Sequence, residues 1–234
     1  MITEIRFQKI ENMEHKRLTL FAGHYGSGKT NIAVNYAMLL AEEGKKVCIA
    51  DLDIVNPYFR TKDSESELAE KGITLISPRY ANTNVDLPAL PAESYRLVQD
   101  KSIFGVVDIG GDDRGAYALG RFADAIKEEG NYRMAFVINR HRPLTSTVED
   151  TVEIMKEIEA ASGIRFNCIV NNSNIGTETT KEIFLESVAF AEALSTATGL
   201  PIWLHTAEKN IAEGISDIPI LPLTLQKKYF DLPH

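Results

Sequence analysis

The sequence predicts an α/β fold in which a doubly wound, mainly parallel sheet is covered by helices on both faces. Short apolar runs recur along the chain, and segments with helical spacing of apolar residues lie between them. The runs are apolar throughout and do not alternate with polar residues, which is typical of strands buried on both faces of a parallel sheet. Alternating strands and helices with right-handed crossovers then place helices on both sides.

Each predicted element has its own signal. The apolar runs of strand length cover residues 18–22, 46–50, 73–76, 104–109, 135–138, 168–170 and 201–204. Apolar residues spaced three and four apart predict helices over residues 32–40, 144–158 and 183–194. Ser146 with Glu149 and Thr179 with Glu182 have the spacing of a capping box, which predicts that two helices begin there.

The composition is that of an ordinary folded protein. With 234 residues and a mass of 26.0 kDa, the chain is expected to form one domain over residues 1–234. Residues 77–91 contain three prolines and two asparagines, which predicts a loop over the sheet edge and no domain boundary.

Charge and cysteine content limit the expected partners and compartment. Asp and Glu number 33 against 25 Lys and Arg, a net charge of −8, and without a basic run we expect no direct nucleic-acid partner. Cys48 and Cys168 lie within apolar runs, which predicts buried free thiols in a reducing cytoplasm. We see no signal-peptide pattern and no apolar run of about 18 residues, so we expect a cytoplasmic protein without a membrane span.

A glycine-rich segment between the first strand and the first helix matches the pattern GxxxxGKT, which predicts a phosphate-binding loop. Its residues are Gly23, His24, Tyr25, Gly26, Ser27, Gly28, Lys29 and Thr30. Glycines let successive backbone N–H groups face an anion, and the following helix presents its positive end to the phosphates. We expect Lys29 to reach the β- and γ-phosphates and Thr30 to bind Mg²⁺.

Acidic residues end two further strands on the same expected side of the sheet. Asp51 begins the segment DLD, which continues to Arg60, and Asp108 begins the segment DIGG, which continues to Arg114. An Asp at such a position can hold Mg²⁺ through its hydration shell, and the DxxG spacing lets the Gly111 N–H turn toward a γ-phosphate. Asp108 is therefore predicted on the metal side of the site, although strand-terminal Asp residues are also common helix caps.

The segments GHYGSGKT, DLD and DIGG together resemble the MinD/ParA/CobQ-like group of deviant Walker A P-loop ATPases, of the SIMIBI class, over nearly the whole chain. The resemblance implies the P-loop NTPase fold, with Asp51 near Mg²⁺ and Asp53 positioning the attacking water. In that group a signature lysine contacts nucleotide across a dimer interface, so the resemblance also implies a homodimer. This chain has His24 at the position of that lysine, and a neutral imidazole supplies no permanent charge at pH 7.

An arginine could supply the charge that His24 lacks. Arg60 and Arg114 follow the two acidic segments, and Arg140 and Arg142 follow the strand 135–138, while each alone has the alternative role of a solvated loop residue. Arg114 is the preferred catalytic candidate because it lies nearest the predicted γ-phosphate sensor in the sequence. Lys29 and Asp53 complete the predicted catalytic set.

The base-binding end of the site is predicted at Asn171 and Asn172. The resemblance places an Asn after this late strand against the adenine, and the guanine-reading NKxD pattern is missing at both Asn139 and Asn171, so ATP is preferred to GTP. The alternative is a pair of turn asparagines before Gly176.

These features together predict a protein that binds Mg·ATP, hydrolyses it slowly and uses its nucleotide state to contact an unidentified protein partner. One alternative is an ATP-dependent small-molecule ligase, amidoligase or kinase of the same fold, with the loop 82–93 and its Asp86 binding an acceptor. Another is an ATP-binding module without hydrolysis.

Overall fold

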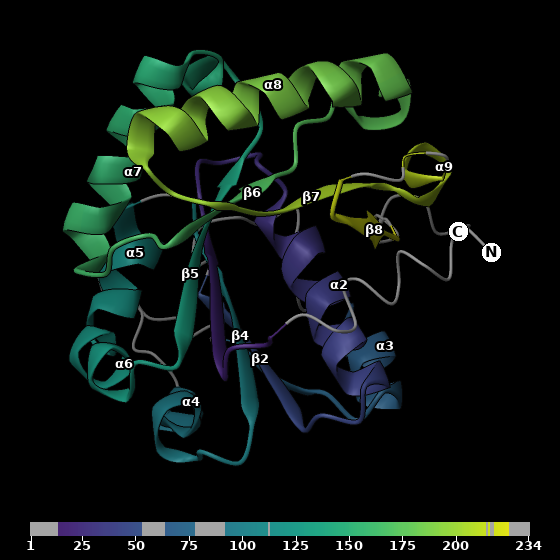
Figure 1. The fold of residues 1–234 in the computed structure, drawn as a ribbon. Helices are drawn as coiled ribbons and strands as arrows, with labels where there is room; N and C mark the ends of the chain where they lie inside the picture. Colours follow the sequence, from purple (N-terminus) through teal and green to yellow (C-terminus); the bar gives the residue numbers. More distant parts are fainter. Residues whose placement is uncertain are drawn as a thin grey trace, which may run out of the picture.

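The computed structural model describes residues 14–52, 64–77, 92–111, 113–213, 215 and 218–224, with the side chains of residues 113 and 114 excepted. Within these ranges the chain forms an eight-stranded, all-parallel sheet in the order β3-β2-β4-β1-β5-β6-β7-β8 (Figure 1). The strands are β1 (Leu18–Ala22), β2 (Val47–Leu52), β3 (Thr74–Ile76), β4 (Phe104–Ile109), β5 (Tyr132–Ile138), β6 (Cys168–Asn171), β7 (Ile202–Glu208) and β8 (Ile220–Leu223). The prediction of a parallel α/β sheet is confirmed.

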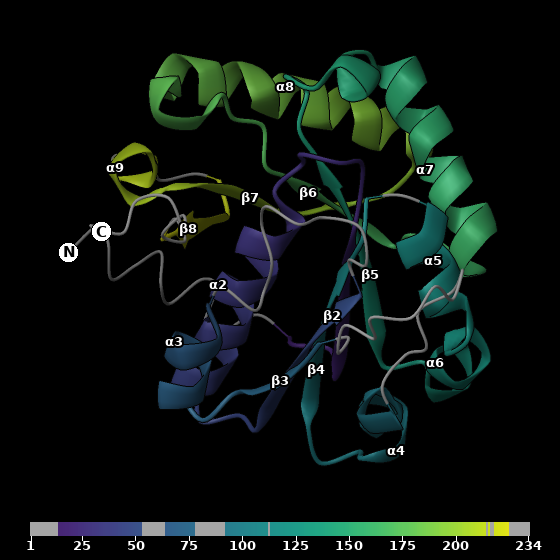
Figure 2. The same ribbon diagram turned by 180° about the vertical axis from the view of Figure 1, so that it is seen from behind.

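Helices cover both faces of this sheet (Figure 2). They are α2 (Lys29–Glu42), α3 (Glu65–Glu70), α4 (Arg96–Gln99), α5 (Asp113–Gly120), α6 (Ala123–Glu129), α7 (Val148–Ser162), α8 (Lys181–Thr198) and α9 (Lys209–Ala212), with short 3₁₀ turns η2 (Ala92–Tyr95), η3 (Pro143–Thr145) and η4 (Gly176–Glu178). One apolar core joins the sheet to α5, α6, α7 and α8, and a second joins its other face to α2 and α3. Successive strand residues supply the two cores alternately: Leu20 packs in the first and Phe21 in the second.

The last strand of the sheet, β8, was missed by the sequence prediction. Its four residues, ILPL, contain Pro222, which weakens the strand signal. Proline is tolerated there because β8 forms the edge of the sheet and one side of its backbone needs no partner strand.

The two predicted capping boxes are wrong by one residue. Thr147 caps α7 by accepting a hydrogen bond from the Asp150 N–H at 3.2 Å, and Thr180 caps α8 by accepting from the Ile183 N–H. The Thr179 hydroxyl instead donates to the Gly176 carbonyl and accepts from the Ile175 N–H. The capping pattern does not specify how long the preceding turn is, so it does not fix the residue at which each helix begins.

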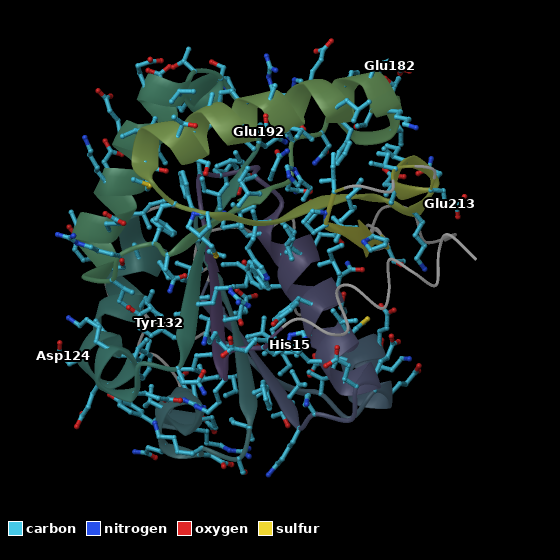
Figure 3. The ribbon with its side chains drawn as sticks, in the orientation of Figure 1. His15, Asp124, Tyr132, Glu182, Glu192 and Glu213 are labelled. Carbon is cyan, nitrogen blue, oxygen red and sulfur yellow. The ribbon has the colours of Figure 1, made fainter. Side chains whose placement is uncertain are left out.

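Acidic side chains lie on the surface of the protein, and the two cysteines are buried. The acidic side chains of Asp124, Glu182, Glu192 and Glu213 lie at the periphery (Figure 3). Cys48 and Cys168 are buried free thiols, as predicted, and burial raises their pKa values to about 11 and about 12. Within the described ranges, no helix combines the length and the apolar character needed to cross a bilayer.

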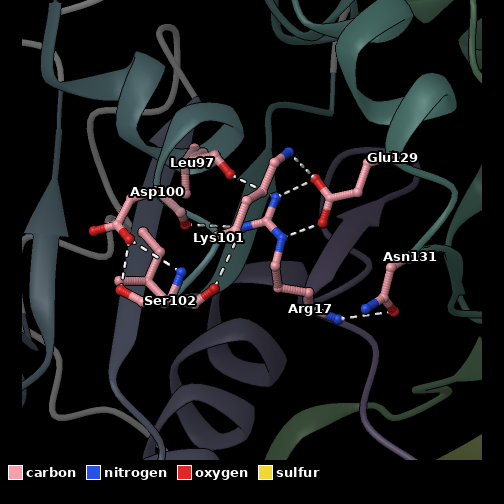
Figure 4. A network of polar contacts seen from close by, with 8 residues as sticks. Arg17, Leu97, Asp100, Lys101, Ser102, Glu129 and Asn131 are labelled. Atoms are coloured by element: carbon pink, nitrogen blue, oxygen red, sulfur yellow. Dashed lines mark hydrogen bonds and ion pairs between the residues drawn. The ribbon is translucent and has the colours of Figure 1, made fainter.

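A buried ion pair lies at the amino end of β1, the end of the sheet opposite the candidate site (Figure 4). Arg17 precedes β1, and its guanidinium donates to both carboxylate oxygens of Glu129 and to the carbonyls of Leu97 and Ile103. Burial alone would raise the pKa of Glu129, but hydrogen bonds from Arg17 and Lys101 outweigh it and hold that pKa below its ordinary value.

Glu129→Gln is expected to lower the free energy of unfolding by about 3 kcal/mol, because the buried Arg17 charge loses its counter-ion. Chemical denaturation at pH 7 measures this difference. The matched control is Glu42→Gln, which removes the exposed pair with Lys71 and should cost about 0.5 kcal/mol. Equal effects of the two changes would show that burial adds nothing to the Arg17–Glu129 pair.

Candidate functional site

The candidate site lies at the carboxyl end of β1, in the middle of the sheet. β1 is flanked by β4 on one side and β5 on the other. The strands β2 and β3 lie on the β4 side and β6 to β8 on the β5 side, so the order in which strands are added reverses at β1. Ligands in open α/β sheets bind at such a switch point, outside the carboxyl ends of the strands.

The glycines of the loop 23–30 are required by its geometry. Gly26 and Gly28 have φ values of 77° and 86°, in the left-handed region that favours glycine. A Cβ at Gly23 would overlap the Val137 carbonyl of β5, and one at Gly28 would overlap the side-chain amide of Asn172. The loop is therefore pressed between the ends of β5 and β6.

Two carbonyl groups of the loop are held by side chains from outside it. The Gly26 carbonyl accepts from Nε of Arg142 at 2.9 Å, and the Ser27 carbonyl accepts from Nδ2 of Asn172 at 2.7 Å. In a trans peptide the N–H of the next residue points the opposite way. The Gly28 N–H therefore points away from Asn172, which is compatible with its binding an anion.

Lys29 and Thr30 are the first residues of α2 and are both buried at the base of the loop. Nζ of Lys29 donates to the His24 carbonyl at 3.3 Å, so the lysine side chain folds back under the loop. Gly111, at the end of β4, adjoins the same loop: a Cβ there would lie 2.7 Å from the Tyr25 nitrogen and 3.0 Å from Nζ of Lys29. The DxxG segment and the phosphate-binding loop are thus in contact.

Asp51 and Asp108 lie side by side at the ends of β2 and β4. They are register partners across the two strands, with 3% and 1% of their surfaces exposed. Two neighbouring carboxylates at strand ends are the kind of oxygen donors with which proteins hold Mg²⁺, the remaining ligands being water and phosphate. Asp53 lies outside the described residues, and so does the side chain of Arg114.

The structure separates the two predicted base-binding asparagines. Asn171 is fully buried in β6: its Nδ2 donates to Ser187 and to Nδ1 of His205, and its Oδ1 accepts from both the N–H and the hydroxyl of Ser173. With all its polar atoms used internally, Asn171 does not line the cavity at the site. Asn172 does, and its Oδ1 accepts from the Thr206 hydroxyl at 2.5 Å.

Two further polar residues, Asn139 and Thr206, were not predicted as site residues. The buried side chain of Asn139 donates to the Asn174 carbonyl and accepts from the Asn174 N–H, which fixes the loop after β6. Thr206 extends the hydrogen bonds of Asn172 to β7. Asn139 follows the predicted strand 135–138, as Asn171 follows the strand 168–170, whereas no local pattern indicates Thr206.

His24 is half-buried beside the loop. Burial, and to a smaller extent the charge of Lys29, lowers its pKa below the ordinary value, while Glu157 opposes the shift. The imidazole is therefore neutral at pH 7. Of the four arginine candidates, Arg60 lies outside the described residues, Arg140 donates to the Glu186 carbonyl on α8, and Arg142 contacts the loop itself.

A cavity of about 1020 Å³ extends from the phosphate-binding loop toward β7. Its walls are the loop, the start of α2, η3, the segment after β6 and the ends of β7 and β8. This volume suits a ligand larger than an isolated phosphate, since small-molecule sites measure about 300–1,000 Å³.

A glycine-rich anion nest between β1 and α2, with two strand-terminal carboxylates beside it, defines a P-loop nucleotide-binding domain. Residues 18–175 match the family model described as the CobQ/CobB/MinD/ParA nucleotide binding domain. The chain belongs to this family, and the resemblance to the MinD/ParA/CobQ-like group is confirmed.

Solved structures share the fold at low sequence identity. Cell division protein FtsY from Thermotoga maritima matches 93% of this chain at 18% identity, with a TM-score of 0.59. Chloroplast FtsY from Physcomitrella patens matches 86% at 15% identity (TM-score 0.58), and the signal recognition particle 54 kDa protein from Aeropyrum pernix, solved in complex with GDP, matches 91% at 17% identity (TM-score 0.54).

This chain spans 71%, 61% and 48% of the lengths of those three proteins. At such identities the likeness shows the fold alone. Comparison with curated protein sequences gave no match.

Gly111→Ala is expected to weaken nucleotide binding about tenfold, because its Cβ would displace the Tyr25 backbone and Lys29. Titration with a fluorescent ATP analogue measures the affinity. Gly120→Ala is the control, since its Cβ meets nothing closer than 3.6 Å and binding should be unchanged. Unchanged binding in Gly111→Ala would mean that the loop does not need this close approach.

His205, beneath the site, should make the protein less stable as the pH falls. Burial lowers its pKa to about 4 from 6.5, and its Nδ1 accepts a hydrogen bond from Asn171, so the fold holds the neutral form. Its contribution is complete above pH 6.5 and is lost progressively between pH 6.5 and 4, by about 3 kcal/mol.

Denaturation curves for the wild type and His205→Asn between pH 7 and 4.5 test this expectation. Asparagine offers an acceptor to Asn171 without titrating, so its free energy of unfolding should fall less with acid than that of the wild type. Parallel pH profiles would remove His205 as the cause.

Proposed function

We propose that the protein binds Mg·ATP at the loop 23–30 and hydrolyses it slowly. The observation that carries this proposal is the geometry of the loop: Gly26 and Gly28 have positive φ values, and Asn172 holds the Ser27 carbonyl, so that the Gly28 N–H points away from Asn172. Membership of the CobQ/CobB/MinD/ParA nucleotide-binding family supports it.

Some residues of the site bind the nucleotide and Mg²⁺, and others take part in hydrolysis. Lys29 contacts the β- and γ-phosphates, and Thr30, Asp51 and Asp108 hold Mg²⁺ directly or through water. The bound Mg²⁺ neutralises charge on the phosphates. Asp53 orients the attacking water, and Lys29 with the loop N–H groups stabilises the charge that develops during in-line transfer. Arg114 adds positive charge near the γ-phosphate.

We propose adenine as the base. Guanine is usually recognised by a carboxylate in the NKxD pattern, and the four residues after Asn171 are Asn, Ser, Asn and Ile. Asn172 is one of several polar residues that line the cavity, and an amide can exchange hydrogen bonds with the adenine edge. Competition between ATP and GTP for a fluorescent nucleotide measures this preference.

The nucleotide state would act on a protein partner through segments 51–60 and 108–114. Gly111 already adjoins the phosphate-binding loop. A γ-phosphate bound at Lys29 would therefore affect the position of the chain that leads into α5. A second copy of this chain is one form that the partner could take.

Phosphate release from Mg·ATP without any other substrate tests the function. We expect slow, steady release by the wild type, and losses of about 100-fold or more in Lys29→Ala and Asp53→Ala. Arg114→Ala should lower turnover with little change in ATP affinity. The control is Lys45→Ala, an exposed lysine that lies over Phe104 far from the loop.

Other outcomes would contradict the proposal in distinct ways. Release that requires an added carboxylate acceptor would support a ligase. ATP binding without release, unaffected by Asp53→Ala, would support a module without hydrolysis.

A further inference from the structure

The side chain of Asn172 is held at both ends of its amide. Nδ2 donates to the Ser27 carbonyl of the phosphate-binding loop at 2.7 Å, and Oδ1 accepts from the Thr206 hydroxyl at 2.5 Å. Asn172 and Thr206 are only 4% and 3% exposed, so water does not readily replace either bond. The amide therefore has its donor end on the loop and its acceptor end on β7.

The backbone of Asn172 is fixed as well. Its N–H donates to the Ile138 carbonyl at 2.9 Å, and its carbonyl accepts from Nδ2 of Asn174 at 2.8 Å. With the backbone held in this way, the direction of the amide depends on the groups at its two ends. The Ser27 carbonyl can only accept a hydrogen bond, whereas a hydroxyl can donate one.

The hydroxyl of Thr206 has a fixed place in the sheet, because β7 pairs with β6 on one side and with β8 on the other. It also lies 3.4 Å from the Asn171 carbonyl, but its distance to Oδ1 of Asn172 is much shorter, as expected for the stronger bond. A hydroxyl has a single proton, so in this arrangement Thr206 donates it to Asn172.

We infer that Thr206 is a positioning residue for the phosphate-binding loop and acts on it through Asn172. The inference rests on the proposed function, because it gives the loop a bound phosphate. With Oδ1 engaged by the hydroxyl, Nδ2 is left to hold the Ser27 carbonyl, and the Gly28 N–H then points away from Asn172. Without the hydroxyl, the buried Oδ1 would lack this donor and the amide would hold Ser27 less firmly. Glycine at position 28 would let the released peptide turn, since it accepts either sign of φ.

Calorimetric titration with Mg·ATP and with inorganic tripolyphosphate tests this role. Thr206→Val keeps the shape of the side chain and removes the hydroxyl, so it should weaken both ligands about tenfold. Thr206→Ser keeps the hydroxyl and should retain wild-type affinity. In an Asn172→Ala background, Thr206→Val should cause no further loss, because the side chain through which it acts is gone. Thr206→Ala takes the place of Thr206→Val in each comparison if the valine variant does not fold.

Hydrogen exchange in the ligand-free protein, followed by NMR, gives a second readout that needs no ligand. In Thr206→Val, exchange of the Asn172 side-chain amide protons should speed up about tenfold more than exchange of the backbone amides of β1. A general loss of stability would instead raise both rates alike. The matched control is Thr151→Val, which removes a buried hydroxyl that donates to the Thr147 carbonyl within α7. It should leave ligand binding and Asn172 exchange unchanged.

Other results would overturn the inference. Full affinity in Thr206→Val would show that the loop does not need the hydroxyl, and a loss for ATP alone would assign Thr206 to the nucleoside end. An equal loss in the Asn172→Ala background would show that Thr206 acts independently of Asn172. Failure of the proposed function is a separate outcome, in which the wild type binds neither ligand, and the exchange of Asn172 then decides the inference alone.

Discussion

The hydrogen bond from the Asn172 amide to the Ser27 carbonyl is the interaction on which the site depends. It is buried, and the same side chain accepts from Thr206, so it joins the loop after β1 to the ends of β6 and β7. Because a carbonyl held on one side turns the following N–H to the other, this bond gives the loop the polarity that an anion needs. Gly28 leaves room for the amide, since any Cβ there would overlap it.

The parallel sheet makes this arrangement possible by bringing all strand ends to one edge. Adjacent strands β2 and β4 place Asp51 and Asp108 opposite each other, although 57 residues separate them in the chain. Both side chains are buried in a sheet with apolar cores on both faces. Carboxylates in such surroundings are well placed to bind a hard cation, which offsets the cost of burying their charge.

The buried polar side chains beneath the cavity are uncharged: they include two amides and a neutral histidine. Asn171 joins β6 to α8 and β7 through Ser187 and His205, and Asn139 joins the turns after β5 and β6. Neutral groups with satisfied hydrogen bonds cost less to bury than ions. They give the cavity walls a fixed geometry, and Lys29 and Arg142 are the Lys and Arg residues of those walls in the part of the chain that the structure describes.

The sequence by itself determined the fold class, the strands β1 to β7, the glycine-rich loop between β1 and α2 and the acidic strand ends, because these depend on local patterns of apolar residues, glycine and charge. It placed the caps of α7 and α8 one residue early and missed β8, where the local signals are weak or interrupted by proline. Only the tertiary structure decided that Asn172 and not Asn171 faces the cavity, and that Arg142 reaches Gly26. The direction of a side chain at a strand end and a contact across 116 residues are set by the packing of neighbouring strands, and no local pattern encodes them.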